Sequence, residues 1–310
     1  MKFPTLLHSV SYAGTWGQAS LSLDAFIDKA SELGFQGVML AAKRPHVSIL
    51  DFGPAERDRL RARLEQRKLR HICVAGYNNL TADWEHGDVP HREIQIHYLV
   101  ELARLTRDLG GSLLRVFTGY ENAAAGYIPQ WNAVVAALKE IAQRSADFGV
   151  TIGVQNHHDL GAGYESQYDL IEAVGEPNCR ALFDAWAPAL HGADIVAAAH
   201  KMAPITAHTT IADYQKRPRY HYQPAVVNYR EAEAYAQAVP MGDGFIDYQG
   251  FLRALDENGF TGSVAYEMCS PLAGGGSMEN LDRCARRFLE YIENLRQTGR
   301  RLEQVGKSAS

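Results

Sequence analysis

The sequence lacks the features that mark several classes of protein. Its four cysteines, Cys73, Cys179, Cys269 and Cys284, are scattered without a C-x-x-C pair, which argues against a disulfide framework or a zinc knuckle and fits reduced thiols. No apolar run approaches the length of a membrane span, and the opening MKFPTLLHSVSYAG has none long enough for a signal peptide. These absences predict a cytoplasmic protein that does not enter a membrane.

The charge balance also excludes a class of partner. With 31 basic and 36 acidic side chains, the net charge is −5, so no basic excess indicates binding to nucleic acid or to an anionic membrane. A hydrophobic content of 46% with 22% charged residues is ordinary for a globular protein with a sizeable core. The 310 residues allow either one barrel or two smaller domains.

Strand-like runs alternate with helix-like segments along the whole chain. Repeated βα units with no change in composition favour a parallel sheet, and eight of them favour a (β/α)8 TIM barrel, an α/β fold. The alternative is a doubly wound open sheet, but no G-x-G-x-x-G follows the first run. We predict one catalytic barrel domain over residues 1–298, with an insertion at about 212–245 after the seventh strand and a flexible tail at 299–310. The predicted strands cover residues 6–10, 37–42, 71–75, 113–117, 150–155, 180–184, 205–210 and 263–267.

The fifth run, in VTIGVQNHHD, directs attention to the strand ends. Its β-branched start is typical of a buried strand, yet it finishes in amides and imidazoles. Active sites of parallel α/β proteins lie at the carboxyl ends of the strands. Because strand side chains alternate, Gln155 and His157 are expected on one face.

Other strand ends carry groups that could converge on this one. Asp184, His208 and Glu267 end three successive strands, and a mixed oxygen and nitrogen set without thiolate suits Mn²⁺, Mg²⁺, Co²⁺ or Zn²⁺. Each residue alone could instead be structural, as a buried ion pair or a hydrogen-bonded core histidine. The first strand offers His8 and the fourth offers Arg115.

This pattern of strand ends resembles the xylose isomerase-like barrels, the sugar isomerases and epimerases of the tagatose-epimerase and hydroxypyruvate-isomerase type. In that family one divalent metal is held by Glu, Asp, His and Glu on strands five to eight. The last three match Asp184, His208 and Glu267, whereas the first falls on Gln155. The resemblance therefore implies a metal, Mn²⁺ first, held by Gln155, Asp184, His208 and Glu267.

The substitution of Gln155 changes the expected chemistry. In the epimerases both glutamates bind metal and shuttle protons, but an amide accepts no proton, so we predict Glu267 and His157 as the acid/base pair, with a His157 pKa suited to neutral pH. A metal-stabilised enolate with a leaving group β to the carbonyl would undergo elimination. The stretches FDAWAPAL and YEMCSPLAGGGS are similar to 3-oxo-glycoside-cleaving members and the large subunit of C-glycoside deglycosidases. The predicted function is thus a metal-dependent carbohydrate lyase; the alternatives are a ketose isomerase or epimerase and a non-catalytic sugar-binding barrel.

Further residues are predicted to bind the carbohydrate. His8, Arg115 and Trp186 stand at or just after strand ends, and Tyr220 and His221 lie in the Tyr- and Arg-rich insertion. A loop this long on the active face is expected to be a lid or a partner surface; the alternative is a helical insertion. The chain is expected to form a homo-oligomer or, in the C-glycoside deglycosidase branch, a hetero-oligomer with a smaller subunit.

The loop at residues 270–277, SPLAGGGS, runs into a helix start and allows two interpretations. Its backbone amides could bind a phosphate or sugar hydroxyls. Equally, the glycines could only make the turn, with Ser277 capping the helix.

Overall fold

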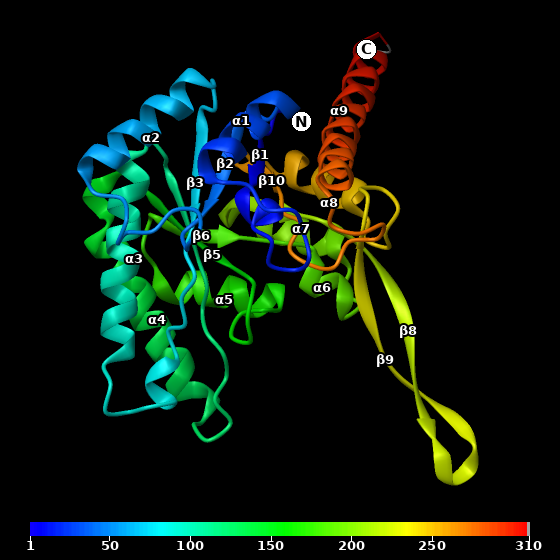
Figure 1. Cartoon of the computed structure of the whole chain (residues 1–310), viewed down its shortest axis with the longest axis horizontal. Coiled ribbons are helices and arrows are strands. Elements are labelled where there is room, and N and C mark those ends of the chain that lie inside the picture. Colours follow the sequence, from blue (N-terminus) through cyan, green and yellow to red (C-terminus); the bar gives the residue numbers. More distant parts are fainter. Residues whose placement is uncertain (309–310) are drawn as a thin grey trace.

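The computed structural model describes the backbone of residues 1–308 and the side chains of residues 1–298, and it shows a closed parallel barrel ringed by helices (Figure 1). The last strand pairs with the first, which closes the barrel. The predicted TIM barrel is confirmed, and the open doubly wound sheet is excluded. In order around the barrel the strands are β1 (Thr5–His8), β2 (Gly37–Ala41), β3 (His71–Ala75), β4 (Leu113–Val116), β5 (Thr151–Gln155), β6 (Cys179–Leu182), β7 (Thr206–Ile211) and β10 (Ser263–Tyr266).

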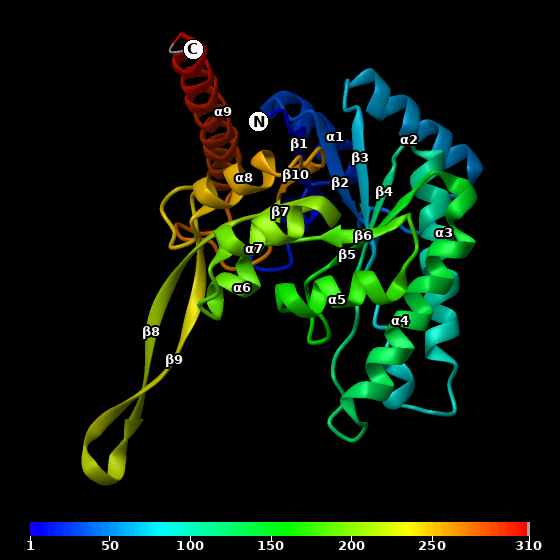
Figure 2. The ribbon, with the colours of Figure 1, turned by 180° about the vertical axis from the view of Figure 1, so that it is seen from behind.

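Helices follow the strands and cover the outside of the barrel (Figure 2). Short 3-10 segments at Ser9–Tyr12, Ala82–Trp84, Ala146–Phe148 and Ala203–Ile205 complete the connections. No helix within the described part of the chain is long and apolar enough to cross a membrane. The α-helices are α1 (Leu23–Leu33), α2 (Pro54–Gln66), α3 (His91–Asp108), α4 (Tyr127–Arg144), α5 (Tyr164–Val174), α6 (Trp186–Leu190), α7 (Ile195–Met202), α8 (Tyr248–Glu257) and α9 (Met278–Ser308).

Two apolar clusters explain why these strands close into a barrel. The larger one packs the helices against the outer strand faces, while a small separate cluster fills the inside. Because strand side chains alternate, residues two positions beyond an inner member also point inward. Arg115, Asp184 and Glu267 stand in that position and thus extend the interior toward the carboxyl ends. The inner cluster consists of Leu6, Met39, Cys73, Ala75, Leu113, Leu182 and Ala265.

The first helix shows how the sequence sets its ends. The Ser22 hydroxyl accepts a hydrogen bond from the Ala25 backbone amide at 3.3 Å, so Ser22 is the N-cap. Gly34 ends the helix at φ 94°, a left-handed conformation that glycine adopts without steric cost.

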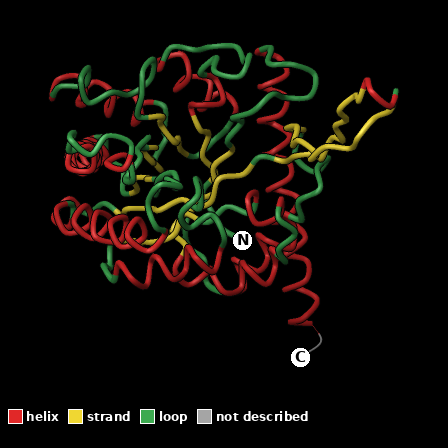
Figure 3. Tube along the Cα trace, turned by 90° about the horizontal axis from the view of Figure 1, so that it is seen from below, coloured by secondary structure: helices red, strands yellow, loops and turns green. Residues whose placement is uncertain are grey.

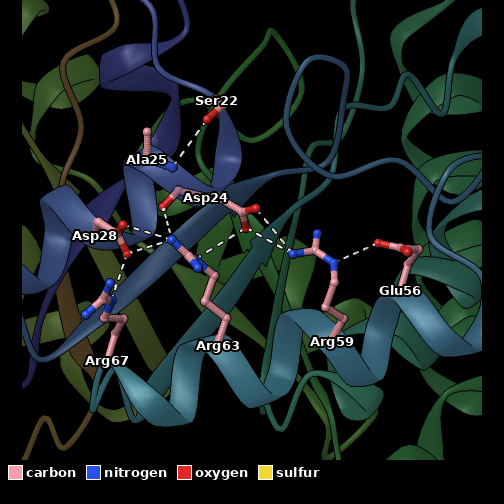
Figure 4. A network of polar contacts seen from close by, with 8 residues as sticks. All are labelled: Ser22, Asp24, Ala25, Asp28, Glu56, Arg59, Arg63 and Arg67. Carbon is pink, nitrogen blue, oxygen red and sulfur yellow. Dashed lines mark hydrogen bonds and ion pairs between the residues drawn. The ribbon is translucent and has the colours of Figure 1, made fainter.

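Ion pairs connect α1 to α2 (Figure 4). Helix α2 itself buries only two leucines. Arg59, Arg63 and Arg67 are spaced by four residues and therefore share one face of α2. Arg63 and Arg67 reach Asp28 at 2.8 and 2.7 Å, and Arg59 reaches Asp24 at 3.2 Å. Exposed pairs of this kind contribute only about 0.2–1 kcal/mol each, so they mainly orient α2.

The insertion after β7 is a β-hairpin, not the helix considered as the alternative. Its antiparallel strands, β8 (Asp213–Gln223) and β9 (Asn228–Val239), are joined by a 3-10 turn at Pro224–Val226. The hairpin leaves the barrel body on one side (Figures 1 and 3). At its base the Asp213 carboxylate accepts backbone hydrogen bonds from Gly242 and Gly244, both at 2.9 Å. A Cβ atom at Gly244 would lie 1.8 Å from Asp213 Oδ1, so this approach requires glycine.

The flexible tail expected at 299–310 stays a prediction. Helix α9 continues to Ser308, and residues 309 and 310 lie outside the described residues. The helix starts from the loop at 270–277, whose two interpretations the contacts distinguish. Ser277 Oγ accepts a hydrogen bond from the Asn280 amide at 3.3 Å, while the Asn280 side chain donates to the carbonyls of Ala273 and Gly275. This loop is a helix-capping turn.

Candidate active site

A cavity of about 500 Å³ opens at the carboxyl ends of the barrel strands. Its charged lining residues are Lys43, Arg115 and Glu267, and imidazoles and aromatic rings form much of the remaining wall. A second cavity of about 40 Å³, here called the annex, shares Glu267 with the first. Of the predicted site residues, the two cavities bring together Arg115, Gln155, His157, Asp184, Trp186 and Glu267.

Asp184 lies at the annex in a dense set of hydrogen bonds. Its Oδ1 accepts from the Thr210 backbone amide at 2.6 Å and from the Thr209 hydroxyl at 3.3 Å, and its Oδ2 accepts from the Gln155 amide and the Thr210 hydroxyl. Burial raises the pKa of Asp184 to about 7, although these donors pull the pKa down. Both carboxylate oxygens are therefore engaged by protein donors.

Glu267 directly follows β10 and lines both cavities. Burial raises the pKa of its carboxyl above the usual value, against the opposing effects of Arg115, Thr210 and Lys43. Glu267 is thus a carboxylate with increased basicity that faces the cavity.

His8, predicted to bind substrate, instead lies against Glu267. Its Nδ1 accepts the Val10 backbone N–H at 3.1 Å, which places the ring hydrogen on Nε2 in the neutral form. That Nε2 lies 3.6 Å from Glu267 Oε1. Burial, followed by the nearby Arg115 charge, keeps the pKa of His8 well below its ordinary value, so the ring stays neutral. His8 is completely buried, and its Nε2 makes no hydrogen bond among the described residues.

His157 shares a face with Gln155, as predicted, since both line the annex. Its predicted pKa near neutrality is wrong: burial, and then the neighbouring His158 and Arg115, lower it to about 3. His157 Nδ1 accepts the His158 backbone N–H at 2.9 Å, so the neutral ring carries its hydrogen on Nε2. His157 is therefore a neutral hydrogen-bond donor at neutral pH.

His208 is not the β7 residue that meets Asp184. It pairs in register with Ser263, the first residue of β10, and its Nδ1 lies 2.7 Å from the Ser263 hydroxyl. Thr210, two residues further and on the same face, contacts both Asp184 and Gln155. The Thr210 hydroxyl thus lies at the annex where the His208 imidazole was expected.

The predicted metal ligand set, Gln155, Asp184, His208 and Glu267, is not assembled. Within the side chains that the structure describes, no three His, Cys, Asp or Glu groups gather closely enough to hold an ion. Gln155 Oε1 has no partner, but its Nε2 donates to Asp184, an orientation that does not direct amide and carboxylate oxygens at one shared cation. An amide, a hydroxyl and a carboxylate already saturated with donors do not fit the expected ion.

Tyr220 and His221 do not reach the cavity. Both lie on the distal half of the hairpin with exposed side chains, and Tyr220 is 60% exposed. Tyr214, at the base of the hairpin, does reach the annex and stacks on Trp186 at 5.1 Å between ring centroids. Trp186 lines both cavities, and its role in substrate binding stays a prediction.

Several cavity residues escaped the sequence analysis, among them Lys43, Tyr77 and Thr210. Lys43 and Tyr77 follow β2 and β3 by two residues, and the Lys43 ammonium lies 4.1 Å from the centre of the Tyr77 ring. Thr210 lies within β7. All three occupy inward positions at strand ends, and the same alternation that pointed to Gln155 and His157 would have found them.

The whole chain resembles known sugar epimerases. A family model described as the xylose isomerase-like TIM barrel matches residues 27–295. Fructoselysine 3-epimerase of Escherichia coli O157:H7 is 20% identical over 262 residues, covering 82% of this chain and 88% of that protein. The rhizopine catabolism protein MocC of Rhizobium meliloti is 25% identical over 204 residues, 61% of this chain and 62% of that protein.

Solved structures with the same barrel include two ketose epimerases. The structure of L-ribulose 3-epimerase superposes with a TM-score of 0.74 at 19% identity, covering 98% of both chains. D-psicose 3-epimerase, crystallised in the presence of D-fructose, gives a TM-score of 0.72 at 16% identity over 94% of this chain and 99% of that one. At such identities these structures support the fold. The C-glycoside deglycosidase branch stays a prediction.

Proposed function

Because this chain belongs to the xylose isomerase-like TIM barrel family, we propose that it is a sugar isomerase that moves a proton at the carbon next to a carbonyl. Relatives with epimerase names support this class of reaction more than the elimination favoured by the sequence. The observation that carries the proposal is Glu267, a carboxylate of raised pKa that lines the cavity. Among the described side chains, the one group recorded within 4.0 Å of it as a possible ion-pair partner is His8, which is neutral.

Glu267 acts as the base in this mechanism. Its carboxylate removes a proton from the carbon beside the carbonyl, and an enediolate forms as the electron pair moves onto the carbonyl oxygen. Neutral His157 donates from Nε2 to that oxygen, as a neutral imidazole can do without a full proton transfer. The Lys43 ammonium adds positive charge at the same cavity wall. The proton of the neighbouring hydroxyl passes to the former carbonyl oxygen within the enediolate. Protonated Glu267 then returns its proton to the former carbonyl carbon, and the carbonyl forms again on the neighbouring carbon.

The distribution of bases favours isomerisation over epimerisation. Epimerisation requires an acid or base on each face of the carbon, and Gln155, where the family has a glutamate, cannot exchange a proton. Asp184 is engaged by four donors and stabilises the annex. A single base can transfer a proton between neighbouring carbons on one face. Elimination would use the same first step with a substrate that carries a β leaving group.

Proton exchange with solvent provides the test. The protein is incubated in D₂O with ketoses, aldoses and 3-oxo-glucosides, and deuterium incorporation and product formation are followed by NMR. We expect exchange with at least one substrate, a loss of at least a hundred-fold in Glu267→Gln, and no loss in Glu172→Gln, an exposed control on α5. Full exchange in Glu267→Gln would contradict the assignment, and release of a leaving group would favour elimination.

A further inference from the structure

Arg115 is a buried cation that forms no ion pair within 4.0 Å among the described side chains. Its side chain is 1% exposed, and neither Nε nor Nη1 has a hydrogen-bond partner among the described residues. The guanidinium lies over the rings of Phe117, at 3.9 Å from the centroid, and Tyr77, at 4.8 Å. The two aromatic ring faces pack against the planar guanidinium. A ring face attracts the cation but does not accept the in-plane hydrogen bonds of the guanidinium N–H groups. Burial of an unpaired charge is strongly unfavourable unless a ligand supplies the opposite charge and the missing hydrogen-bond acceptors.

The cavity around Arg115 has an excess of positive charge. The charged residues that line it are Lys43, Arg115 and Glu267, two cations and one anion. His157 and His158 line the same wall but stay neutral, since burial lowers the pKa of both. The surplus cation contrasts with the net charge of −5 of the whole chain. An anionic ligand would balance the cavity.

We propose that the substrate carries an anionic group, a carboxylate or a phosphate, and that the Arg115 guanidinium binds it. Carboxylates and phosphates accept several N–H bonds from one guanidinium, which would satisfy the donors left free here. Lys43 lies on the same wall and adds attraction for the anion. The identity of the reaction rests on the proposed function, whereas the binding of an acidic sugar does not.

A role of Arg115 as counter-ion to Glu267 explains the arrangement less well. No ion pair within 4.0 Å joins the two among the described side chains, and the group that does approach Glu267 is His8 Nε2. Arg115 still lowers the pKa of Glu267 through space. Such an effect would change a pH profile, but it would not make the protein discriminate between an acidic sugar and its neutral analogue.

Matched pairs of probes test the inference on the unmodified protein. D-glucuronate is compared with D-glucuronamide, and D-fructose 6-phosphate with D-fructose, by calorimetry and by quenching of tryptophan fluorescence, because Trp16 and Trp186 line the cavity. We expect the acidic member of at least one pair to bind ten-fold or more tightly than its neutral partner. The pair that shows the difference distinguishes carboxylate from phosphate. Equal binding of acid and neutral members in both pairs would overturn the inference.

Variants then assign the effect to one residue. Arg115→Met should abolish the difference between acid and neutral probes, and Arg230→Met, an exposed control on β9, should keep it. If Arg115→Met does not fold, Arg115→Lys and Lys43→Met replace it, and each should weaken binding of the acid several-fold while leaving the neutral probe unchanged. Retention of the full difference in the folded Arg115 variants would disprove the assignment. Acid binding without deuterium exchange would refute only the proposed function, whereas exchange with neutral ketoses and indifference to acids would refute only this inference.

Discussion

Individual side chains at the carboxyl ends of the strands were partly predictable. Gln155, Asp184 and Glu267 stand out because polar groups that end buried strands need a partner or a function. Thr210 was missed because His208, two positions earlier on the same face, has the more familiar ligand chemistry. Both His208 and Thr210 point inward, and the stagger between neighbouring strands decides which of them lies at the same height as Asp184. The pairing of β6 with β7 shifts between Ala181 and Leu182, and one strand read alone does not reveal this.

The mismatch at the annex can be reversed by two substitutions. Gln155→Glu with Thr210→His would place Glu, Asp, His and Glu on strands β5, β6, β7 and β10, the set that the family resemblance implied. We expect the double variant to bind Mn²⁺ at about one ion per chain, and the unmodified protein to retain no stoichiometric ion after gel filtration. Metal content by mass spectrometry measures both. A stoichiometric ion in the unmodified protein that is lost in Asp184→Ala would show that the annex residues do hold a divalent ion, against our inference.

Arg115 also makes a prediction about stability. In the ligand-free protein, Arg115→Met removes a buried unpaired charge and keeps an apolar chain against Phe117 and Tyr77. We expect the free energy of unfolding to stay within about 1 kcal/mol or to rise. In the control Arg57→Met, loss of the 2.7 Å pair with Asp108 should destabilise by about 1–3 kcal/mol. Urea denaturation measures both, and the reverse order would show that Arg115 is a structural residue.

At the scale of elements, the barrel was predictable and the hairpin was not. Each barrel strand is a short apolar run followed by a helix with its own stop, such as Gly34 after α1. The hairpin lacks the usual signature of a two-residue Asn-Gly or Asp-Gly turn. Its turn is Pro224–Val226 followed by Val227 at φ 48°, a left-handed conformation that is unusual for a β-branched residue. Propensity alone did not indicate it.

The hairpin should be dispensable for folding of the barrel. Its distal part is exposed, whereas its base is buried at Asp213, Tyr214, Ala238 and Val239. Lys216 pairs with Ala236, so an Asn-Gly turn can replace residues 217–235 without change of register. We expect the melting temperature, measured by circular dichroism, to change by less than about 4 °C, which corresponds to roughly 1 kcal/mol.

A substitution at the hairpin base provides the contrast. Tyr214→Ala should destabilise by about 3–5 kcal/mol, as expected for loss of a buried aromatic side chain that stacks on Trp186. If removal of residues 217–235 unfolded the barrel while Tyr214→Ala did not, the distal hairpin would be part of the core assembly. Size-exclusion chromatography of the shortened chain would also test the predicted homo-oligomer, because exposed Tyr220, Tyr222 and Tyr229 form the surface that is lost.

At the scale of the whole molecule, buried titratable groups predict how stability depends on pH. Burial lowers the pKa of His157 and His208 to about 3 and that of His158 to about 4, and holds the pKa of His8 well below its ordinary value of 6.5. Below pH 6.5 the unfolded chain takes up protons on these residues while the folded protein does not. Each histidine therefore favours unfolding by up to about 1.4 kcal/mol per pH unit.

Buried carboxyls of raised pKa work in the opposite direction. The pKa of Asp184 is raised to about 7, so below pH 7 the folded protein binds a proton that the unfolded chain does not yet bind, and this stabilises the fold as the pH falls toward 4. Burial also lowers the pKa of His46 and His71, and it also raises the pKa of Asp213 and Glu267. The six histidines outweigh the three carboxyls. We expect the free energy of unfolding to fall by an amount on the order of 3–6 kcal/mol between pH 7 and pH 5, a large share of a typical domain stability. Urea denaturation at constant ionic strength measures the slope.

The variant His208→Gln separates this histidine effect from general acid denaturation. His208 contacts Ser263 and lines neither cavity, so its replacement tests burial and not catalysis. An amide can keep the hydrogen bond to Ser263 but does not titrate, so the slope between pH 6 and pH 5 should become shallower by about 1.4 kcal/mol per pH unit. Glu172→Gln, exposed on α5, should leave the slope unchanged. An unchanged slope in His208→Gln would mean that His208 is protonated in the folded barrel, and the surplus of positive charge inside it would then be larger than the one assigned to Arg115 and Lys43.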